Sequence, residues 1–132
     1  MIEVEVSCEL PGVDRAPLVQ RLRSVLAREG IADASVGLMV VDADQMAGIN
    51  REHRDRPTPT DVLSFPIDGV DAEQVSGGPA PELGDIVICP DAANDPLTTL
   101  VVHGALHLLG YDHEVDGGEM LARQAELIEE LN

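Results

Sequence analysis

The chain has 132 residues, the size of one ordinary domain with a single core. Hydrophobic residues make up 44% of it but aromatic residues only 2%, so the core must be built from aliphatic side chains. The formal net charge is −17, with 25 acidic residues against 8 arginines and no lysine, which argues against loose, sequence-independent binding to nucleic acid. A very acidic host proteome, such as that of a halophile, would also explain the charge.

The N-terminal residues are acidic, whereas a signal peptide begins with basic residues, and the chain has no apolar run of 18 residues. We therefore expect a cytoplasmic protein with no membrane contact. Cys8 and Cys89 lie in apolar segments that resemble strands. This placement favours buried free thiols over a disulfide.

The first part of the chain predicts a strand, a helix and a second strand. Residues 2–7 alternate between apolar and acidic types, as in a half-buried strand. Asp14 can cap a helix that has Pro17 in its first turn, and Gly30 ends that helix. The apolar run 34–41 predicts a central strand that is covered on both faces.

The middle of the chain predicts a helix, an edge strand and a loop. Asp42 or Asp44 caps the helix, which ends near His53. Residues 61–66 predict a short strand, and its terminal proline places it at a sheet edge. Residues 68–82 are rich in glycine, proline and acidic residues and predict a mobile loop.

The last part of the chain predicts one strand and two helices. Residues 84–89 form the strand, and a connector with one helical turn leads to a helix over 98–109. A final amphipathic helix covers 118–131. Its inward positions are predicted to be Met120, Leu121, Leu127, Ile128 and Leu131. The fold class is α+β: a single domain over 1–132, with a small mixed sheet packed against helices.

Three of the four histidines lie within residues 103–113. On a helix His103 and His107 stand at i and i+4, about 5–6 Å apart, so both rings can reach one cation. Gly110 can reverse the chain in a left-handed C-cap and bring His113 over the same helix face. Three neutral nitrogens with a fourth position open to water are typical of a catalytic zinc site. The alternative is three core or surface histidines without an ion, but their spacing favours metal binding.

The same spacing, H-x-x-x-H-x-x-G-x-x-H, occurs in metzincin proteases, where glutamate follows the first histidine as general base. Here Gly104 occupies that position and offers no proton acceptor. Peptide hydrolysis by the metzincin route is therefore disfavoured. A metzincin-like site of three histidines without the carboxylate suits a reaction in which the ion supplies the nucleophile or the electrophile, such as phosphodiester cleavage.

Three separate stretches together resemble the bacterial YbeY endoribonuclease family: the histidine segment 103–113, residues 59–66 (PTDVLSFP) and residues 83–88 (LGDIVI). The resemblance runs over nearly the whole chain. It implies a zinc-dependent, single-strand-specific endoribonuclease with one Zn²⁺ per chain. Such an enzyme acts in 3′-end maturation of small-subunit (16S) rRNA and in ribosome quality control. Its implied partners are single-stranded rRNA, the small ribosomal subunit and its proteins, or an assembly GTPase.

The resemblance also assigns roles to residues. His103, His107 and His113 match the metal ligands, and Arg54 matches the family's functional arginine. A guanidinium in that place can bind two phosphate oxygens and neutralise developing charge, although an exposed arginine at a helix end is also common.

The sequence departs from the family at two places. His53 stands where the family usually has an aromatic residue; it can stack on a base, move a proton, or be a solvated surface residue. The connector between Cys89 and His103, with residues 90–102, is shorter than the family normally has. Its length affects one wall of the expected cleft and leaves the ligands unchanged.

Several points stay open at the level of sequence. The nucleophile is either water activated by the ion or the substrate's own 2′-hydroxyl, and Asp112 either orients a ligand imidazole or serves only as a turn residue. Thr60, Asp61 and Ser64 can line the cleft, while Tyr111 packs under the turn. Two other functions compete with the nuclease: a ribosome-assembly factor whose metal is mainly structural, and a metallohydrolase of peptides or small molecules.

Overall fold

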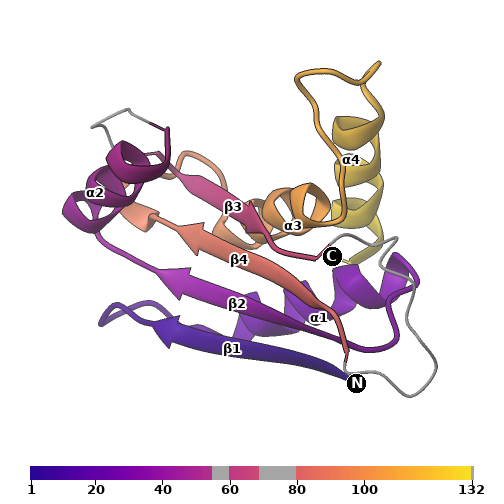
Figure 1. The fold of residues 1–132 in the computed structure, drawn as a ribbon, viewed down its shortest axis with the longest axis horizontal. Helices are drawn as coiled ribbons and strands as arrows, with labels where there is room; N and C mark the ends of the chain where they lie inside the picture. The colour runs from indigo at the N-terminus through magenta and orange to yellow at the C-terminus, as the bar shows by residue number, and fades with distance from the viewer. Residues whose placement is uncertain (55–59, 69–79, 132) are drawn as a thin grey trace.

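A four-stranded sheet in the order β1-β2-β4-β3 forms the centre of the protein (Figure 1). The structure is a computed structural model, and it describes residues 1–54, 60–68 and 80–131. Strands β1, β2 and β4 run parallel, and β3 pairs antiparallel with β4 at the sheet edge, as predicted from its prolines. The strands are β1 (Ile2–Cys8), β2 (Ala34–Val40), β3 (Val62–Pro66) and β4 (Glu82–Ile88).

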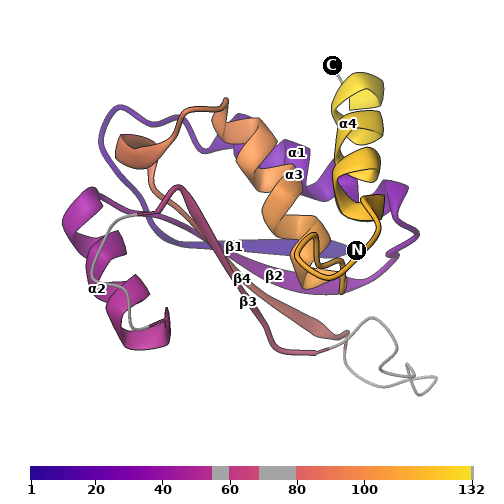
Figure 2. The ribbon, with the colours of Figure 1, turned by 90° about the horizontal axis from the view of Figure 1, so that it is seen from above.

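Helices cover the two faces of the sheet unequally (Figure 2). Helices α1, α3 and α4 lie on one face, and α2 lies on the opposite side at one end of the strands. The helices are α1 (Ala16–Arg28), α2 (Ala43–Arg54), α3 (Leu97–Leu108) and α4 (Glu119–Leu131), with a short 3-10 turn at η1 (Pro90–Ala92). The predicted α+β class with a small mixed sheet is therefore confirmed.

The core is aliphatic, as the composition predicts. A main cluster fills the space between the sheet and helices α1, α3 and α4, and Leu22, Leu38, Ile86 and Leu106 are fully buried in it. A smaller cluster under α2 packs around Met46. The unequal coverage corrects the prediction for the run 34–41, which expected both strand faces to be covered. Strand β2 is internal, but buried and half-buried residues alternate along it because α2 reaches only one end of the second face.

Local side-chain hydrogen bonds lie at the starts of the first two helices, although the N-cap residue of α1 is Arg15 and not the predicted Asp14. Asp14 accepts a hydrogen bond from the backbone N–H of Ala16 at 3.1 Å. Asp42, not Asp44, caps α2: its carboxylate accepts from the N–H of Gln45 at 2.8 Å, and the Gln45 side chain accepts from the N–H of Asp42 at 3.0 Å. This reciprocal pair is a capping box, which satisfies two backbone donors at the helix start.

Two sequence-based predictions need correction. Leu121 is 53% exposed, because the inward stripe of α4 runs from Met120 to Leu127, and Leu121 lies about 100° away from it. Strand β4 begins at Glu82, two residues before the predicted start of the strand and at the last residue of the predicted loop 68–82. Asp68 and Glu82 are joined by a backbone hydrogen bond, and residues 69–79 lie outside the described part.

The thiol state of the two cysteines agrees with expectation. Cys89 is buried and Cys8 half-buried, and both are free thiols. Among the described helices, none is both long enough and apolar enough to span a bilayer.

Helix α3 lies close against the sheet at Gly104. A β-carbon built there would lie 2.8 Å from Cγ2 of Ile86 in β4 and 3.2 Å from Oγ of Ser64 in β3. The Ser64 hydroxyl donates a hydrogen bond to the Gly104 carbonyl at 3.1 Å. A glycine at this point therefore lets the histidine-bearing helix rest directly on strands β3 and β4.

Replacing this glycine tests the close approach. Gly104→Ala is expected to lower the free energy of unfolding by about 1–3 kcal/mol, because the added methyl group overpacks a closed contact. Gly48→Ala is the matched control: it is also a helical glycine, but its β-carbon would meet no atom within 4 Å. That change should raise stability by about 0.5–1 kcal/mol. Equal effects of both changes in urea denaturation would contradict the packing described.

Candidate metal centre

Three imidazole rings meet at the C-terminal end of α3. One nitrogen from each of His103, His107 and His113 lies within 4.8 Å of the other two, and the ring centroids are 4.8–5.2 Å apart. His103 and His107 are half-buried, and His113 is exposed. The structure thus brings together all three histidines that the sequence marks as ligands, and it does so at a spacing one cation can bridge.

The end of α3 places the third histidine. Gly110 adopts a φ of +100°. The N–H of Gly110 donates to the carbonyl of His107 and that of Tyr111 to the carbonyl of Leu106, both at 3.1 Å. This pair of bonds is a Schellman motif, which closes a helix and reverses the chain. The predicted left-handed cap is confirmed, and it carries His113 back over the two helical rings.

Hydrogen bonds fix the orientation of both helical rings. Nδ1 of His107 lies 3.0 Å from the carbonyl oxygen of Tyr111. A carbonyl can only accept, so Nδ1 must carry the proton and Nε2 keeps its lone pair for an ion. Nδ1 of His103 lies 2.8 Å from Oε1 of Gln124 in α4, which favours the same tautomer. Such outer contacts orient metal-bound histidines.

The surroundings of His107 favour the neutral form of its ring. Burial lowers the pKa of His107 below its ordinary value, and the neighbouring His103 lowers it further. The backbone carbonyl of Tyr111 and the carboxylate of Asp112 act in the opposite direction but do not reverse the shift. A neutral imidazole at neutral pH is the form that binds a metal ion.

A cleft of about 500 Å³ opens beside the rings. Strand β3 and the residues before it form one wall, and the turn after α3 forms the other. The lining residues are Thr60, Asp61, Val62, Leu63, Ser64, Pro66, His103, His107, Gly110, Tyr111, Asp112, His113 and Glu114. The expectation that Thr60, Asp61 and Ser64 line the cleft is confirmed. Because the ligands are part of the lining, an ion held by them would face this space.

Known proteins are similar to this chain in sequence and in fold. The profile of the family described as Endoribonuclease YbeY matches residues 13–132. The chain belongs to the YbeY endoribonuclease family.

Two relatives illustrate the similarity. The Endoribonuclease YbeY of Nocardia farcinica is 38% identical, over 98% of this chain and 80% of its own length. That of Sulfurovum sp. is 42% identical, over 78% of this chain and 76% of its own. A solution structure from Thermotoga maritima superposes with a TM-score of 0.59 at 28% identity, covering 98% of this chain and 88% of that one.

Gly104 stands where a metzincin carries its glutamate. The side of α3 at Gly104 faces Ile86 and Ser64, so a glutamate there would enter the packed sheet contact. The missing carboxylate is thus a consequence of how α3 lies on the sheet. No general base can be supplied from this position.

Two residues that the sequence left open now have defined contacts. Asp112 accepts a hydrogen bond from the N–H of Glu114 at 3.0 Å, the role of a turn residue. Tyr111 packs against the main core, and its hydroxyl donates to Glu29 at 3.3 Å. The Tyr111 backbone carbonyl, rather than the Asp112 side chain, orients His107.

The structure describes the side chain of only one of the two candidate residues on α2. Arg54 is the last residue of α2, and its side chain lies outside the described part of the structure. His53 is exposed, and its ring lies 4.8 Å from that of Phe65, tilted by 56°. His53 therefore makes a ring-to-ring contact with strand β3.

Gln124 is the site residue that sequence reasoning missed. It lies four residues after Met120 and three before Leu127, within the inward stripe of α4. A polar residue at an inward helical position was the available signal, because such a side chain needs a partner when the helix packs. Here its partner is His103.

Changing Gln124 tests this contact. Gln124→Ala is expected to weaken Zn²⁺ or Co²⁺ binding about tenfold or more, because His103 loses the acceptor that orients it. Gln124→Glu keeps an acceptor and should bind the metal nearly as wild type does. Leu121→Ala, at an exposed position of the same helix, is the control and should leave affinity unchanged. Equal metal affinity of Gln124→Ala and wild type in a chelator competition would contradict the assignment.

Proposed function

We propose that the chain is a zinc-dependent, single-strand-specific endoribonuclease that acts in 3′-end maturation of 16S rRNA and in ribosome quality control. The observation that carries the proposal is the convergence of His103, His107 and His113 beside an open cleft. The endoribonuclease names of the relatives support a nuclease activity.

The donor set fits one zinc ion per chain. Three neutral imidazoles are ligands that zinc accepts in catalytic sites, with a fourth position open to water or substrate. His103, His107 and His113 would hold the ion on the cleft side of α3. When bound, zinc supplies a Lewis acid and lowers the pKa of a coordinated water towards neutrality.

The charges of the cleft support the presence of a bound cation there. Asp61, Asp112 and Glu114 line the cleft, and no arginine is among its described lining residues. Three carboxylates would repel a phosphodiester, so the protein's own side chains around the rings disfavour an anionic substrate. A divalent ion between the histidines offsets this repulsion at the place where the phosphate must sit.

In this proposal Arg54 holds the scissile phosphate. Its guanidinium would bind two phosphate oxygens and neutralise charge that develops at phosphorus. The nucleophile is either a water at the open position or the 2′-hydroxyl of the RNA. End-group analysis of the products distinguishes them, because a 2′,3′-cyclic phosphate rules out direct attack by water.

Partners would compensate for the acidic surface. A net charge of −17 disfavours RNA binding by the bulk field. We propose that the small ribosomal subunit, its proteins or an assembly GTPase brings the protein to single-stranded rRNA in the cytoplasm. The same charge also favours the second candidate, a ribosome-assembly factor whose metal is mainly structural. A peptide hydrolase is disfavoured by the packing at Gly104.

Two substitutions separate metal binding from phosphate handling. His107→Ala should lose both bound zinc and cleavage of a defined rRNA precursor. Arg54→Ala should keep zinc, while cleavage falls about 10²–10³-fold, the usual loss when one donor to transition-state charge is removed. Arg51→Ala, an exposed arginine on the same helix, is the matched control and should retain both. Metal content and gel-based cleavage are measured on the same highly purified samples.

The outcomes also separate the two candidate functions. Equal cleavage by wild type and His107→Ala would show that the activity comes from a contaminant and would favour the assembly factor. Loss of zinc in Arg54→Ala would contradict the assignment of Arg54 to phosphate.

A further inference from the structure

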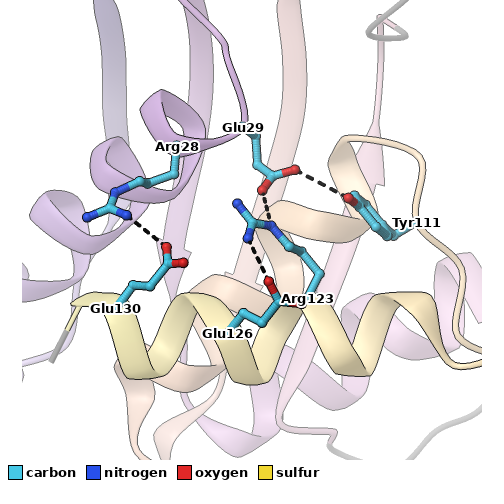
Figure 3. Close-up of polar contacts among 6 residues, drawn as sticks. All are labelled: Arg28, Glu29, Tyr111, Arg123, Glu126 and Glu130. Atoms are coloured by element: carbon cyan, nitrogen blue, oxygen red, sulfur yellow. Dashed lines mark hydrogen bonds and ion pairs between the residues drawn. The ribbon is translucent and has the colours of Figure 1, made fainter.

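A single carboxylate from helix α1 joins the two elements that orient the histidines (Figure 3). Glu29 follows the last residue of α1, and its side chain is only 12% exposed. One carboxylate oxygen accepts from Nε of Arg123 in α4 at 2.6 Å. The other accepts from the hydroxyl of Tyr111, in the turn after α3, at 3.3 Å.

Both partners of Glu29 are next to groups that hold a ligand ring. Arg123 precedes Gln124, whose carboxamide oxygen faces Nδ1 of His103. Tyr111 supplies the carbonyl that accepts from Nδ1 of His107, and His113 follows it by two residues. Glu29 therefore contacts α4 and the turn after α3 at the same time, and each of its two partners is next to or carries a group that contacts a histidine ring.

We infer that Glu29, with Arg123 and Tyr111, is a positioning device that sets the metal affinity of the three-histidine site. This inference rests on the metal centre of the proposed function. The Glu29 carboxylate fixes the distance between α4 and the turn after α3. At that distance Gln124 contacts the His103 ring and the Tyr111 carbonyl contacts the His107 ring. Without it, each outer partner can shift while the ligands themselves stay intact.

A neighbouring ion pair shows what a purely structural contact looks like. Arg28 and Glu130 also join α1 to α4, at 2.8 Å, but their side chains are 49% and 41% exposed. In Figure 3 this pair is joined only to itself, with no dashed line to Glu29, Tyr111 or Arg123. Exposed pairs of this kind contribute little to stability, whereas Glu29 and Arg123 are largely shielded from water.

The test measures Co²⁺ affinity by chelator competition on folded protein, with the visible spectrum of the Co²⁺ form as a second readout. Glu29→Ala should raise the dissociation constant about tenfold, the lower end for outer partners of metal ligands, and should alter the spectrum. Tyr111→Phe keeps the ring and the backbone carbonyl but removes the donor, and should raise it by a smaller factor. Glu29→Gln keeps an oxygen acceptor for Arg123 and should recover most of the affinity.

Glu130→Ala is the matched control and should leave both the affinity and the spectrum as in wild type. The inference is overturned if Glu29→Ala and Tyr111→Phe bind Co²⁺ like wild type, even where their unfolding midpoints fall. Failure of wild type itself to bind Co²⁺ or Zn²⁺ would overturn the metal centre, and the inference with it. The two failures are therefore distinguishable.

Discussion

The structure depends on three imidazole rings, each of which brings one nitrogen within 4.8 Å of the other two. Rings this close would repel one another if protonated, and burial of His107 keeps that ring neutral. The Nδ1 hydrogens of His103 and His107 are directed to Gln124 and to the Tyr111 carbonyl, which leaves the opposite nitrogens unshared. The geometry is thus prepared for a cation before one arrives.

The rest of the fold serves this arrangement by placing α3 directly on β3 and β4. A glycine at position 104 permits the contact, and Ser64 ties the helix backbone to the strand. The edge strand β3 then forms the wall of the cleft opposite the ligand turn. The same packing that buries α3 also removes the place where a metzincin would carry its base. Because carboxylates line the cleft, a bound ion would supply positive charge next to the rings.

Much of the architecture was predictable because local rules and tertiary packing agree. The periodicity of apolar residues predicted the strands and helices. The terminal proline predicted the edge position of β3, and the i, i+4 spacing with Gly110 predicted the three converging histidines. The prediction that both faces of β2 are covered was wrong, because an apolar run does not reveal how far a neighbouring helix extends over the sheet. The inward placement of Leu121 was wrong, because adjacent residues on a helix point in directions that differ by about 100°. Gln124 and Glu29 were missed because their partners lie 21 and 82 residues away and meet only in the folded chain.

The central claim is that three histidines and no other protein group hold one zinc ion. X-ray absorption spectroscopy on the zinc-loaded protein tests it most directly. The account predicts three imidazole nitrogens and one oxygen ligand at about 2.0–2.1 Å, with one zinc per chain. A sulfur ligand near about 2.3 Å, or a fourth protein ligand closing the site, would contradict it.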